Sequence, residues 1–598
     1  MRVVLISPCR LHGLVLLTVV LLPLWAMAAE LTIPYEVLIK GVQDGALQKG
    51  LESVSDAIAL KERPPESLSL LRRRTEKDQK EFLQYLRAMG YYGASVGTEL
   101  NTETEPVQLI FHVVTGPAYR LKGFDLTWSQ AAGAEGLEPP VADSLGLALG
   151  EPFKTENLLE AEKKALRFLG DKGLPFPKIS DRKVIVDHAD HSVAVFLRID
   201  PGPRALFGPL EVEGLETVSE RLIRRKVPWT EGDPFKADLL PKLQKDLLEL
   251  GLFSAVQVSQ GEAIDEEGRI PIFVKVKERK HRSVGAGVSY RTDEKLGVQL
   301  SWENRNLLGE NERLSVVGTF SDLTHSAEAG FRKPYFYRQD QALNLNSRLA
   351  EETPEAYKSV SLTNTGLLVR DLTRTWKLGG GLGFKEARVT QLDESRDFSL
   401  MFLPMQLSWD GSDNLLDPSR GGRLGIQISP YHDLAKEDLN FLKGRVNYGH
   451  YLPILGSPST ILAGRVTMGI VAGEDRLDIP ADERFYAGGG GSVRGYSYKS
   501  LGPRTGFTPT GGKSLLELSL ENRIKITDRI GLVFVVDGGN AFADITPSPD
   551  ERLFWGAGTG LRYYTPIGPF RFDIAFPLSR RAGMDDSFHI YVSLGQAF

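Results

Sequence analysis

Cysteine is almost absent from this sequence: the single cysteine, Cys9, lies within the first 28 residues. Those residues have the three parts of a secretory signal, with two arginines, an apolar run from Leu14 to Trp25, and a small-residue cleavage site at Ala26-Met27-Ala28. We therefore predict that residues 1–28 form a signal peptide that is removed on export. The mature chain would then have no disulfide, no thiolate zinc site and no thiol catalyst.

Long apolar runs are also missing. After residue 28 no stretch approaches the roughly 20 apolar residues of a membrane-spanning helix, and the run inside the signal is too short for an anchor. If the exported protein enters a membrane, it must do so as a closed β-barrel, because a barrel is the other fold that satisfies every backbone polar group in lipid.

Excess positive charge and catalytic clusters are absent as well. Without the signal, 70 basic residues face 77 acidic ones, a formal charge of −7, whereas nucleic-acid binding needs a concentrated basic field. The 9 histidines form no close cluster, and no nucleophile motif or metal-ligand spacing is recognisable. We predict a protein that is not an enzyme, holds no metal or other cofactor, and has no nucleic-acid partner.

One unit occurs three times between the signal and residue 281. Each copy reads strand, helix, helix, strand, strand, and we place the copies at residues 29–117, 118–203 and 204–281. A glycine follows each long helix (Gly90, Gly173 and Gly251), where it suits a left-handed C-cap. Three further glycines in the opening strands (Gly41, Gly123 and Gly214) are expected to permit a bend into the first helix. Unrelated α+β segments are the alternative interpretation.

From residue 282 to residue 598 the helical period stops and short alternating runs appear, separated by turn residues. We count about sixteen runs, at roughly 20 residues for each strand with its turn, which is typical of a transmembrane barrel. They start near residues 282, 297, 312, 325, 341, 357, 373, 397, 420, 439, 460, 513, 530, 552, 568 and 587. The pattern predicts a 16-stranded antiparallel transmembrane β-barrel after the α+β repeats.

A soluble β-sandwich has a similar period and is the alternative to the barrel. The export signal, the even strand count and aromatic residues near strand ends, such as Tyr335 and Tyr563, favour the barrel. Alternation is plainest in the last strand, where one face carries apolar side chains and is expected to meet lipid. Its residues are Phe588, Ile590, Val592, Leu594 and Phe598.

A segment of about 40 residues separates the strands near 460 and 513, far above the usual length of a connection. Its centre contains four consecutive glycines at 488–491 and then Val493-Arg494-Gly495-Tyr496. A phosphate site is not indicated, because neither P-loop spacing nor a helix start follows the glycines. A connection of this length is expected to have a function.

The motif Val493-Arg494-Gly495-Tyr496 resembles the sixth-loop motif of the outer-membrane assembly superfamily, which contains BamA, TamA and the two-partner secretion transporters. The three repeats resemble the periplasmic POTRA domains of that superfamily. The segment 413–422 is similar to a motif at the start of a strand in these barrels, and Phe598 is similar to the C-terminal signal of outer-membrane barrels. The resemblance covers nearly the whole mature chain and implies POTRA repeats followed by an outer-membrane barrel.

In this superfamily the loop arginine enters the barrel and pairs with acids of the inner wall, which implies that Arg494 pairs with Asp537. The wall motif, phenylalanine-x-aspartate-x-glycine, resembles residues 535–539, with Val535 in place of the phenylalanine. A second acid is implied at Glu521, which alternation places on the lumen face. A buried guanidinium needs a planar carboxylate partner, so the chemistry agrees. A solvated loop arginine is the alternative.

Three repeats and about 600 residues resemble TamA, a translocation and assembly module subunit. That resemblance implies insertion of autotransporters and other unfolded outer-membrane proteins, with a TamB-like inner-membrane-anchored partner at the first repeat and passage of outer-membrane lipid as a further possibility. It also implies weak pairing of the first strand with the last, so that the barrel opens sideways. Gly285, Gly287 and Gly595 would weaken packing at that seam.

Two other classes of function stay open on the sequence alone. A passive outer-membrane channel or lipid conduit with a periplasmic extension would pass solutes steadily, whereas a barrel plugged by its long loop would pass little. A receptor would need a soluble ligand that the sequence does not reveal.

Overall fold

The computed structural model describes residues 32–129, 133–292, 294–435, 438–456, 458–547, 550–565 and 568–594. The predicted signal peptide, Gly595 and Phe598 lie outside these residues. Contacts divide the chain into two compact units, one with the first two repeats and one with most of the third repeat and the barrel. Within the described ranges, no helix has both the length and the apolarity to cross a membrane.

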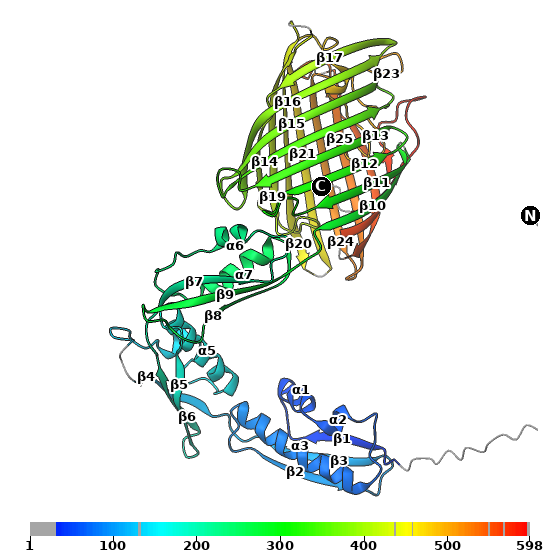
Figure 1. Ribbon diagram of the computed structural model, residues 1–598. Helices are drawn as coiled ribbons and strands as arrows, with labels where there is room; N and C mark the ends of the chain where they lie inside the picture. The colour runs from blue at the N-terminus through cyan, green and yellow to red at the C-terminus, as the bar shows by residue number, and fades with distance from the viewer. Residues whose placement is uncertain are drawn as a thin grey trace, which may run out of the picture. The chain divides into compact units, whose positions relative to one another are not determined.

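Each repeat is a three-stranded sheet with helices beside it (Figure 1), in the predicted order strand, helix, helix, strand, strand apart from one additional short helix in the first repeat. The sheet orders are β1-β3-β2, β4-β6-β5 and β7-β9-β8, so the last strand of each repeat is central. The elements of the first repeat are β1 (Tyr35–Lys40), α1 (Gly45–Ser53), α2 (Asp56–Ala59), α3 (Leu68–Ala88), β2 (Ser95–Asn101) and β3 (Val107–Val114). Those of the second are β4 (Arg120–Trp128), α4 (Ala142–Leu145), α5 (Thr155–Asp171), β5 (Lys178–Asp187) and β6 (Ser192–Asp200). Those of the third are β7 (Leu206–Glu213), α6 (Glu220–Lys226), α7 (Leu239–Glu249), β8 (Phe253–Gln260) and β9 (Arg269–Glu278).

Helical spacing on α3 and alternation on β3 build the core of the first repeat. Leu71, Phe82 and Leu86 are buried on one face of α3, and they join Leu109 and Phe111, which alternation places on one face of β3. The sequence therefore buries one stripe of the helix against one face of the sheet.

The three glycines after the long helices adopt positive φ, 90° at Gly90, 95° at Gly173 and 71° at Gly251. These are left-handed conformations that favour glycine, so the predicted helix ends are confirmed.

The glycines of the opening strands behave in two ways. A Cβ at Gly41 would lie 2.1 Å from the carbonyl oxygen of Val113, and one at Gly214 would lie 2.0 Å from that of Val276, so only glycine fits beside the central strand. The prediction for Gly123 is wrong: this residue lies inside β4, where the pairing with β6 shifts register after Leu121. The bend in the second repeat does not use a glycine of β4.

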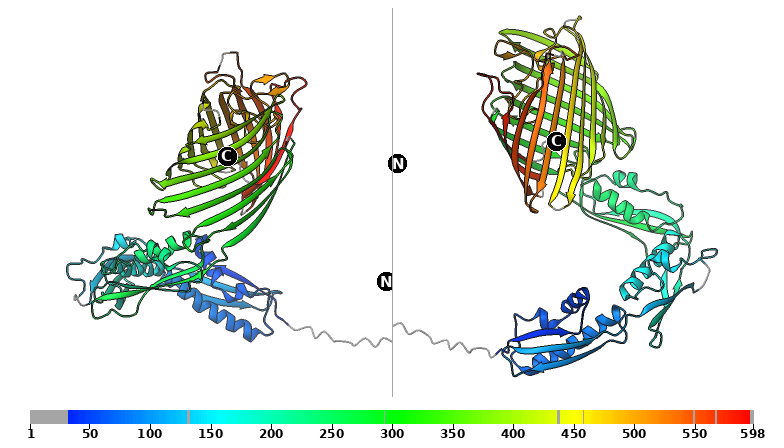
Figure 2. Two further views of the ribbon diagram at one scale, coloured as in Figure 1. Left: turned by 45° about the horizontal axis from the view of Figure 1, so that its top comes forward. Right: turned by 180° about the vertical axis from the view of Figure 1, so that it is seen from behind.

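The second part of the chain is a closed antiparallel barrel of tilted strands (Figures 1 and 2). Its strands are β10 (Arg282–Arg291), β11 (Lys295–Asn304), β12 (Arg313–Phe320), β13 (Thr324–Pro334), β14 (Gln341–Glu352), β15 (Lys358–Asp371), β16 (Trp376–Gln391), β17 (Glu394–Phe402), β18 (Met405–Asp410), β19 (Gly421–Asp433), β20 (Asn440–Gly456), β21 (Ser459–Gly473), β24 (Ser514–Lys525), β25 (Ile530–Phe542), β26 (Phe554–Thr565), β27 (Gly568–Pro577) and β28 (His589–Leu594). Segments β17 and β18 both pair with β16 and β19, so they share one position and the ring has sixteen positions. The predicted starting points lie within three residues of the observed ones.

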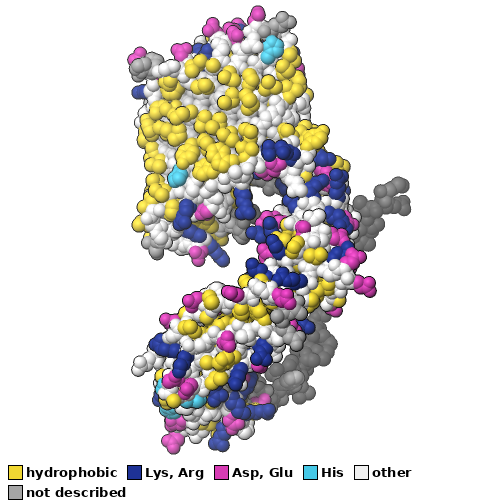
Figure 3. Space-filling view, turned by 90° about the vertical axis from the view of Figure 1, so that its left-hand side faces the viewer, with side chains coloured by type: hydrophobic (Ala, Val, Ile, Leu, Met, Phe, Trp, Pro, Cys, Tyr) yellow, Lys and Arg dark blue, Asp and Glu magenta, His cyan; other side chains and the backbone are white. Residues whose placement is uncertain are grey.

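The outer wall of the barrel is apolar. Hydrophobic side chains gather in a broad band over the wall, whereas charged side chains lie toward its ends (Figure 3). Along β24, Leu520 is exposed outward while its neighbours Ser519 and Glu521 are buried inside. Alternation therefore gives each strand one lipid-facing row and one lumen-facing row.

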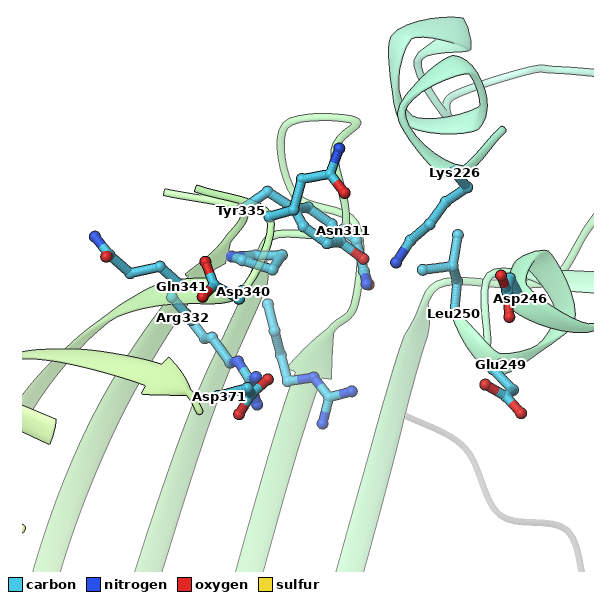
Figure 4. A pocket seen from close by; sticks show the side chains of 14 residues that line it. Lys226, Asp246, Glu249, Leu250, Asn311, Arg332, Tyr335, Asp340, Gln341 and Asp371 are labelled. Atoms are coloured by element: carbon cyan, nitrogen blue, oxygen red, sulfur yellow. The ribbon is translucent and has the colours of Figure 1, made fainter. Parts of the chain in front are cut away.

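The third repeat contacts the barrel at the turn after β13. The ring of Tyr335 lies 4.7 Å from Nζ of Lys226 and 5.2 Å from the guanidinium carbon of Arg225, and it packs against the core of the repeat. A cavity of about 460 Å³ lies here, with Lys226 and Leu250 on the repeat side and Tyr335 on the barrel side (Figure 4). Tyr335 therefore lies directly after the end of β13, as predicted, and belongs to this junction.

Glu278, at the end of β9, holds the loop between β7 and α6. Its carboxylate accepts hydrogen bonds from the backbone N–H groups of Glu216 (2.8 Å), Thr217 (3.0 Å) and Val218 (2.8 Å) and from the Thr217 hydroxyl (2.7 Å). Burial raises the pKa of this carboxyl, but the hydroxyl and backbone hydrogen bonds outweigh burial and leave the pKa at about 2. The ionised form of Glu278 therefore stabilises this loop.

Glu278→Gln is expected to weaken amide hydrogen-exchange protection at Glu216, Thr217 and Val218 at pH 7, because the neutral amide accepts weaker hydrogen bonds. Since the folded pKa of Glu278 lies below its ordinary value of 4.5, the stabilisation is complete above pH 4.5 and declines as the pH falls toward 2. As the pH is lowered from 7, amide-exchange protection of these residues, corrected for the intrinsic exchange rate, should therefore decrease in the wild type. In the variant it should change little. Glu211→Gln, at an exposed position, is the control; equal protection in the wild type and Glu278→Gln would contradict this assignment.

Candidate functional site

The connection between β21 and β24, residues 474–513, folds into the barrel. It contains a short helix, η1 (Ala481–Glu483), and a small hairpin of β22 (Arg504–Thr505) and β23 (Thr508–Pro509). Loop side chains join side chains of the inner wall in one apolar cluster, and those from the loop are Ile479, Ala481, Phe485, Ala487, Val493, Tyr496 and Leu501. The long connection is therefore packed as part of the barrel interior.

Arg494 lies at the centre of this loop and is buried, with 3% of its side chain exposed. Its Nε donates to Oδ2 of Asp537 at 2.6 Å and its Nη2 donates to Oδ1 at 2.9 Å, a two-pronged contact with β25. Its Nη1 donates to Oε1 of Glu521 on β24 at 2.6 Å. The structure thus brings together the arginine and the two acids singled out in the sequence, and one planar guanidinium bridges two adjacent strands.

The ion cluster extends beyond these three residues. The other oxygen of Glu521 accepts from Nη2 of Arg523 at 2.8 Å. Asp573 on β27 lies 3.7 Å from Nη1 of Arg494 and also contacts Arg562 and Arg571. Three arginines and three carboxylates on the inner faces of β24 to β27 therefore surround Arg494, and every carboxylate of the cluster has at least one guanidinium partner.

The residues beside Arg494 reach the remaining strands. Gly495 has a φ of +94°, and a Cβ there would lie 2.7 Å from the carbonyl carbon of Phe576 in β27. Its N–H donates to the Tyr591 hydroxyl on β28 at 3.1 Å. The Tyr496 hydroxyl donates to the carbonyl of Trp555 on β26 at 3.0 Å. The loop motif therefore contacts five consecutive strands, β24 to β28.

The wall motif at 535–539 fits the loop through its glycine. A Cβ at Gly539 would lie 2.9 Å from Cγ2 of Val493, so a side chain there would collide with the loop. Val535 is buried but supplies no ring. The ring near this end of the cluster is Tyr451, which lies 5.7 Å from the guanidinium carbon of Arg523. An aromatic partner thus comes from β20 and not from the wall motif.

The first and last strands meet in a short seam. In the described residues, β10 and β28 pair at Tyr290 with Val592 and at Arg291 with Tyr591. Thr292 adds three hydrogen bonds to Ile590: its N–H and its hydroxyl donate to the Ile590 carbonyl oxygen at 3.1 and 3.0 Å, and its hydroxyl accepts from the Ile590 N–H at 2.6 Å. By comparison, β10 pairs with β11 along its whole length, from Arg282 to Arg291. The seam is therefore the shortest lateral joint among the described strands.

The predicted faces of the last strand agree with the structure over the described residues. Phe588 and Leu594 are exposed, whereas His589 and Tyr591 are buried inside. Phe598 lies outside the described residues.

Sequence reasoning missed Arg523, Arg562, Arg571, Asp573 and Tyr591. The signal that could have found them is alternation, because each lies on the lumen-facing row of its strand, as Glu521 does on β24.

Comparisons with known proteins agree with this geometry. The sequence profile of the Omp85 superfamily domain matches residues 306–598, and that of the POTRA domain, described as a surface antigen variable number repeat, matches residues 205–279. The solved structure of BamA from Haemophilus ducreyi lacking POTRA domains 1–3 has a similar fold, with a TM-score of 0.69, 19% sequence identity, and coverage of 80% of this chain and 100% of that one.

Two curated relatives are named outer membrane protein assembly factor BamA. The protein from Nitratidesulfovibrio vulgaris is 25% identical over 546 residues, covering 88% of this chain and 68% of the relative. The protein from Neisseria meningitidis is 21% identical over 478 residues, covering 69% of this chain and 59% of the relative. The chain thus belongs to the Omp85 superfamily, with its β-barrel in the outer membrane and its POTRA repeats in the periplasm.

Proposed function

We propose that this protein is an outer-membrane assembly and translocation factor that inserts or secretes β-barrel proteins, autotransporters among them, through a lateral gate between β10 and β28. The observation that carries the proposal is the seam: over the described residues, two register pairs and the Thr292–Ile590 hydrogen bonds join β10 to β28, whereas β10 and β11 pair from Arg282 to Arg291. An exposed strand edge can pair with an incoming strand by β-augmentation. The names of the curated relatives support the same class of function.

The exposed side of β10 supports the gate. Val284 and Val288 are 82% and 70% exposed, more than other described apolar side chains in the barrel strands. Gly285 and Gly287 both lie between these valines in the sequence, so β10 has few side chains that could pack against a neighbouring strand. An unfolded outer-membrane protein could pair with this edge, and its first strand would then extend the sheet.

The contacts of the loop motif indicate which strands of the barrel stay in place when the gate opens. Because residues 493–496 contact β24 to β28, the loop holds the C-terminal side of the seam in place through Tyr591. No comparable contact of the motif reaches β10 in the described residues. In our proposal, β10 and its neighbours move when the gate opens, while β28 stays with the loop.

We also propose a partner for the periplasmic repeats. Three POTRA repeats, which we count in the described residues, are the number that TamA has, and this supports a TamB-like inner-membrane-anchored protein that meets the first repeat. The edge strand β2 of that repeat pairs only with β3 and leaves one edge for such a partner. Co-purification from membranes tests this pairing directly.

A passive channel or lipid conduit is the competing function. Its lumen would have to be open, whereas apolar and ion-paired loop residues are packed inside this barrel. We therefore favour the assembly factor.

Arg494→Ala should release the part of the loop around residues 493–496 and lower assembly activity while the barrel stays inserted. Removing one partner of a buried ion pair costs on the order of 3 to 5 kcal/mol, because the carboxylates of Asp537 and Glu521 lose their counter-charge. Arg494→Lys should be almost as damaging, since a single ammonium group cannot make the hydrogen bonds by which the planar guanidinium reaches both Asp537 and Glu521. Protease cleavage of the loop in isolated membranes, with Arg529→Ala on an exposed turn as control, measures the release. Full protection of the loop in both variants would argue against the anchor.

A disulfide across the seam should block the gate. Tyr290→Cys with Val592→Cys places two cysteines at register partners on β10 and β28, within the roughly 7 Å between Cα atoms that a disulfide allows. The only native cysteine, Cys9, lies in the predicted signal peptide. The oxidised protein should lose assembly of unfolded outer-membrane proteins, and reducing agent should restore it.

The matched control is Val288→Cys with Val298→Cys, register partners on β10 and β11, which crosslinks two strands on one side of the seam. This pair should oxidise without loss of activity. If the oxidised seam pair retains full activity, the lateral gate is excluded.

A further inference from the structure

Two acids of the loop lie against two lysines of the barrel wall, away from Arg494. Nζ of Lys385 on β16 lies 2.8 Å from Oδ2 of Asp482 and 2.5 Å from Oε1 of Glu483. Nζ of Lys443 on β20 lies 2.8 Å from Oε2 of Glu483. The Ser359 hydroxyl on β15 donates to Asp482 at 2.8 Å. Three wall strands therefore hold the two carboxylates of η1.

The surroundings make these contacts strong. Lys385 is 8% exposed, and the neighbouring lumen-facing positions on β16 are Ala387 and Val389, which belong to the apolar cluster. A lysine in such a place needs a carboxylate partner, because its charge has lost water. With two lysines and two acids the group is neutral, so neither side leaves an uncompensated charge.

Arg484 fixes the direction in which the acids point. Its guanidinium donates to the carbonyl oxygens of Ile479 (2.8 Å), Leu477 (2.9 Å) and Thr510 (2.8 Å), and to the side-chain oxygen of Gln391 on β16 (2.8 Å). These bonds join the outgoing and returning limbs of the loop to the wall. The acids are thus presented to the lysines by a rigid backbone.

This group lies apart from the Arg494 cluster, and its arrangement of charges between loop and wall is the opposite. Lys385 lies on β16, six strand positions from β25 in the ring of sixteen. Here the loop supplies the acids and the wall supplies the cations, the reverse of the arrangement at Arg494. Glycines at 488–491 lie between the two groups, and they allow each end of the loop to settle without straining the other.

We infer that Asp482 and Glu483 form a second, charge-reversed anchor, which holds the first half of the loop in the lumen when the Arg494 anchor is lost. Lys385 and Lys443 are positioning residues for this half of the loop. The inference rests on the plugged barrel of the proposed function, and its test uses loop exposure instead of assembly, so that either can fail alone.

The absence of cysteine from residues 10–598 allows each end of the loop to be measured separately. Ala481→Cys reports the acid end and Val493→Cys the arginine end, and both native side chains are buried. Labelling with a membrane-impermeant maleimide on whole cells gives the exposure rate. A heat-dependent shift in gel migration confirms that each variant barrel is folded.

Glu483→Lys should raise labelling at position 481 on the order of a hundredfold, because it breaks a buried ion pair, and should leave position 493 within a few-fold of wild type. Arg494→Ala should do the reverse. The exchange Glu483→Lys with Lys443→Glu should restore protection at position 481. Glu483→Gln removes the charge without reversing it and should cause a milder loss of protection, so it replaces Glu483→Lys if that variant does not fold. If Arg494→Ala exposes both positions equally, or if neither Glu483 variant exposes position 481, the second anchor does not exist.

Discussion

A guanidinium enclosed in a membrane barrel can persist only with carboxylates around it, and the position of Arg494 follows from this constraint. Its fork contacts Asp537 on β25 and Glu521 on β24, and both acids are there because alternation turns every second residue of a strand toward the lumen. The second half of the loop and its contacts with the last five strands depend on this bridge. Without Arg494, the carboxylates of Asp537 and Glu521 would lose a buried counter-charge.

The same bridge divides the barrel mechanically. Each strand from β24 to β27 has two strand partners and a contact with the loop, and β28 is held by β27 and by the loop. By contrast, β10 has one long partner, β11, and a joint with β28 that is short over the described residues. We expect this joint to separate first. The proposed lateral gate would then follow from where the loop is anchored.

Much of the architecture could be predicted from the sequence because it is local. Periods of two and of about 3.6 residues gave the strands and helices, and the glycines after the long helices marked left-handed caps with φ near 90° at Gly90 and Gly173. Arg494, Asp537 and Glu521 could be singled out by resemblance and alternation. Gly123 was misjudged, because local pattern does not tell a bend from a register shift inside β4.

The remaining features depend on which distant segments meet. Nothing near Asp482 and Glu483 in the sequence indicates that Lys385, almost 100 residues earlier, lies against them. The position of Tyr335 near a strand end was predictable, but its packing on the third POTRA repeat, where two cations of α6 lie beside its ring, was not. The strand pattern around Tyr591 gives no sign of its hydrogen bond with Gly495 of the loop. Tertiary contacts of this kind are outside the reach of pattern and propensity.

Distances between spin labels, measured by electron paramagnetic resonance, show whether the seam moves while the loop stays anchored. One pair of labels at Val288 on β10 and Phe572 on β27 spans the seam, and a second pair at Phe507 in the loop hairpin and Leu561 on β26 reports the loop; all four side chains are exposed. When an unfolded outer-membrane protein is added, the account predicts longer and broader distances for the first pair and an unchanged distance for the second. A change in the second pair with the first unaltered would contradict it, because the loop would then be leaving a barrel whose seam remains closed.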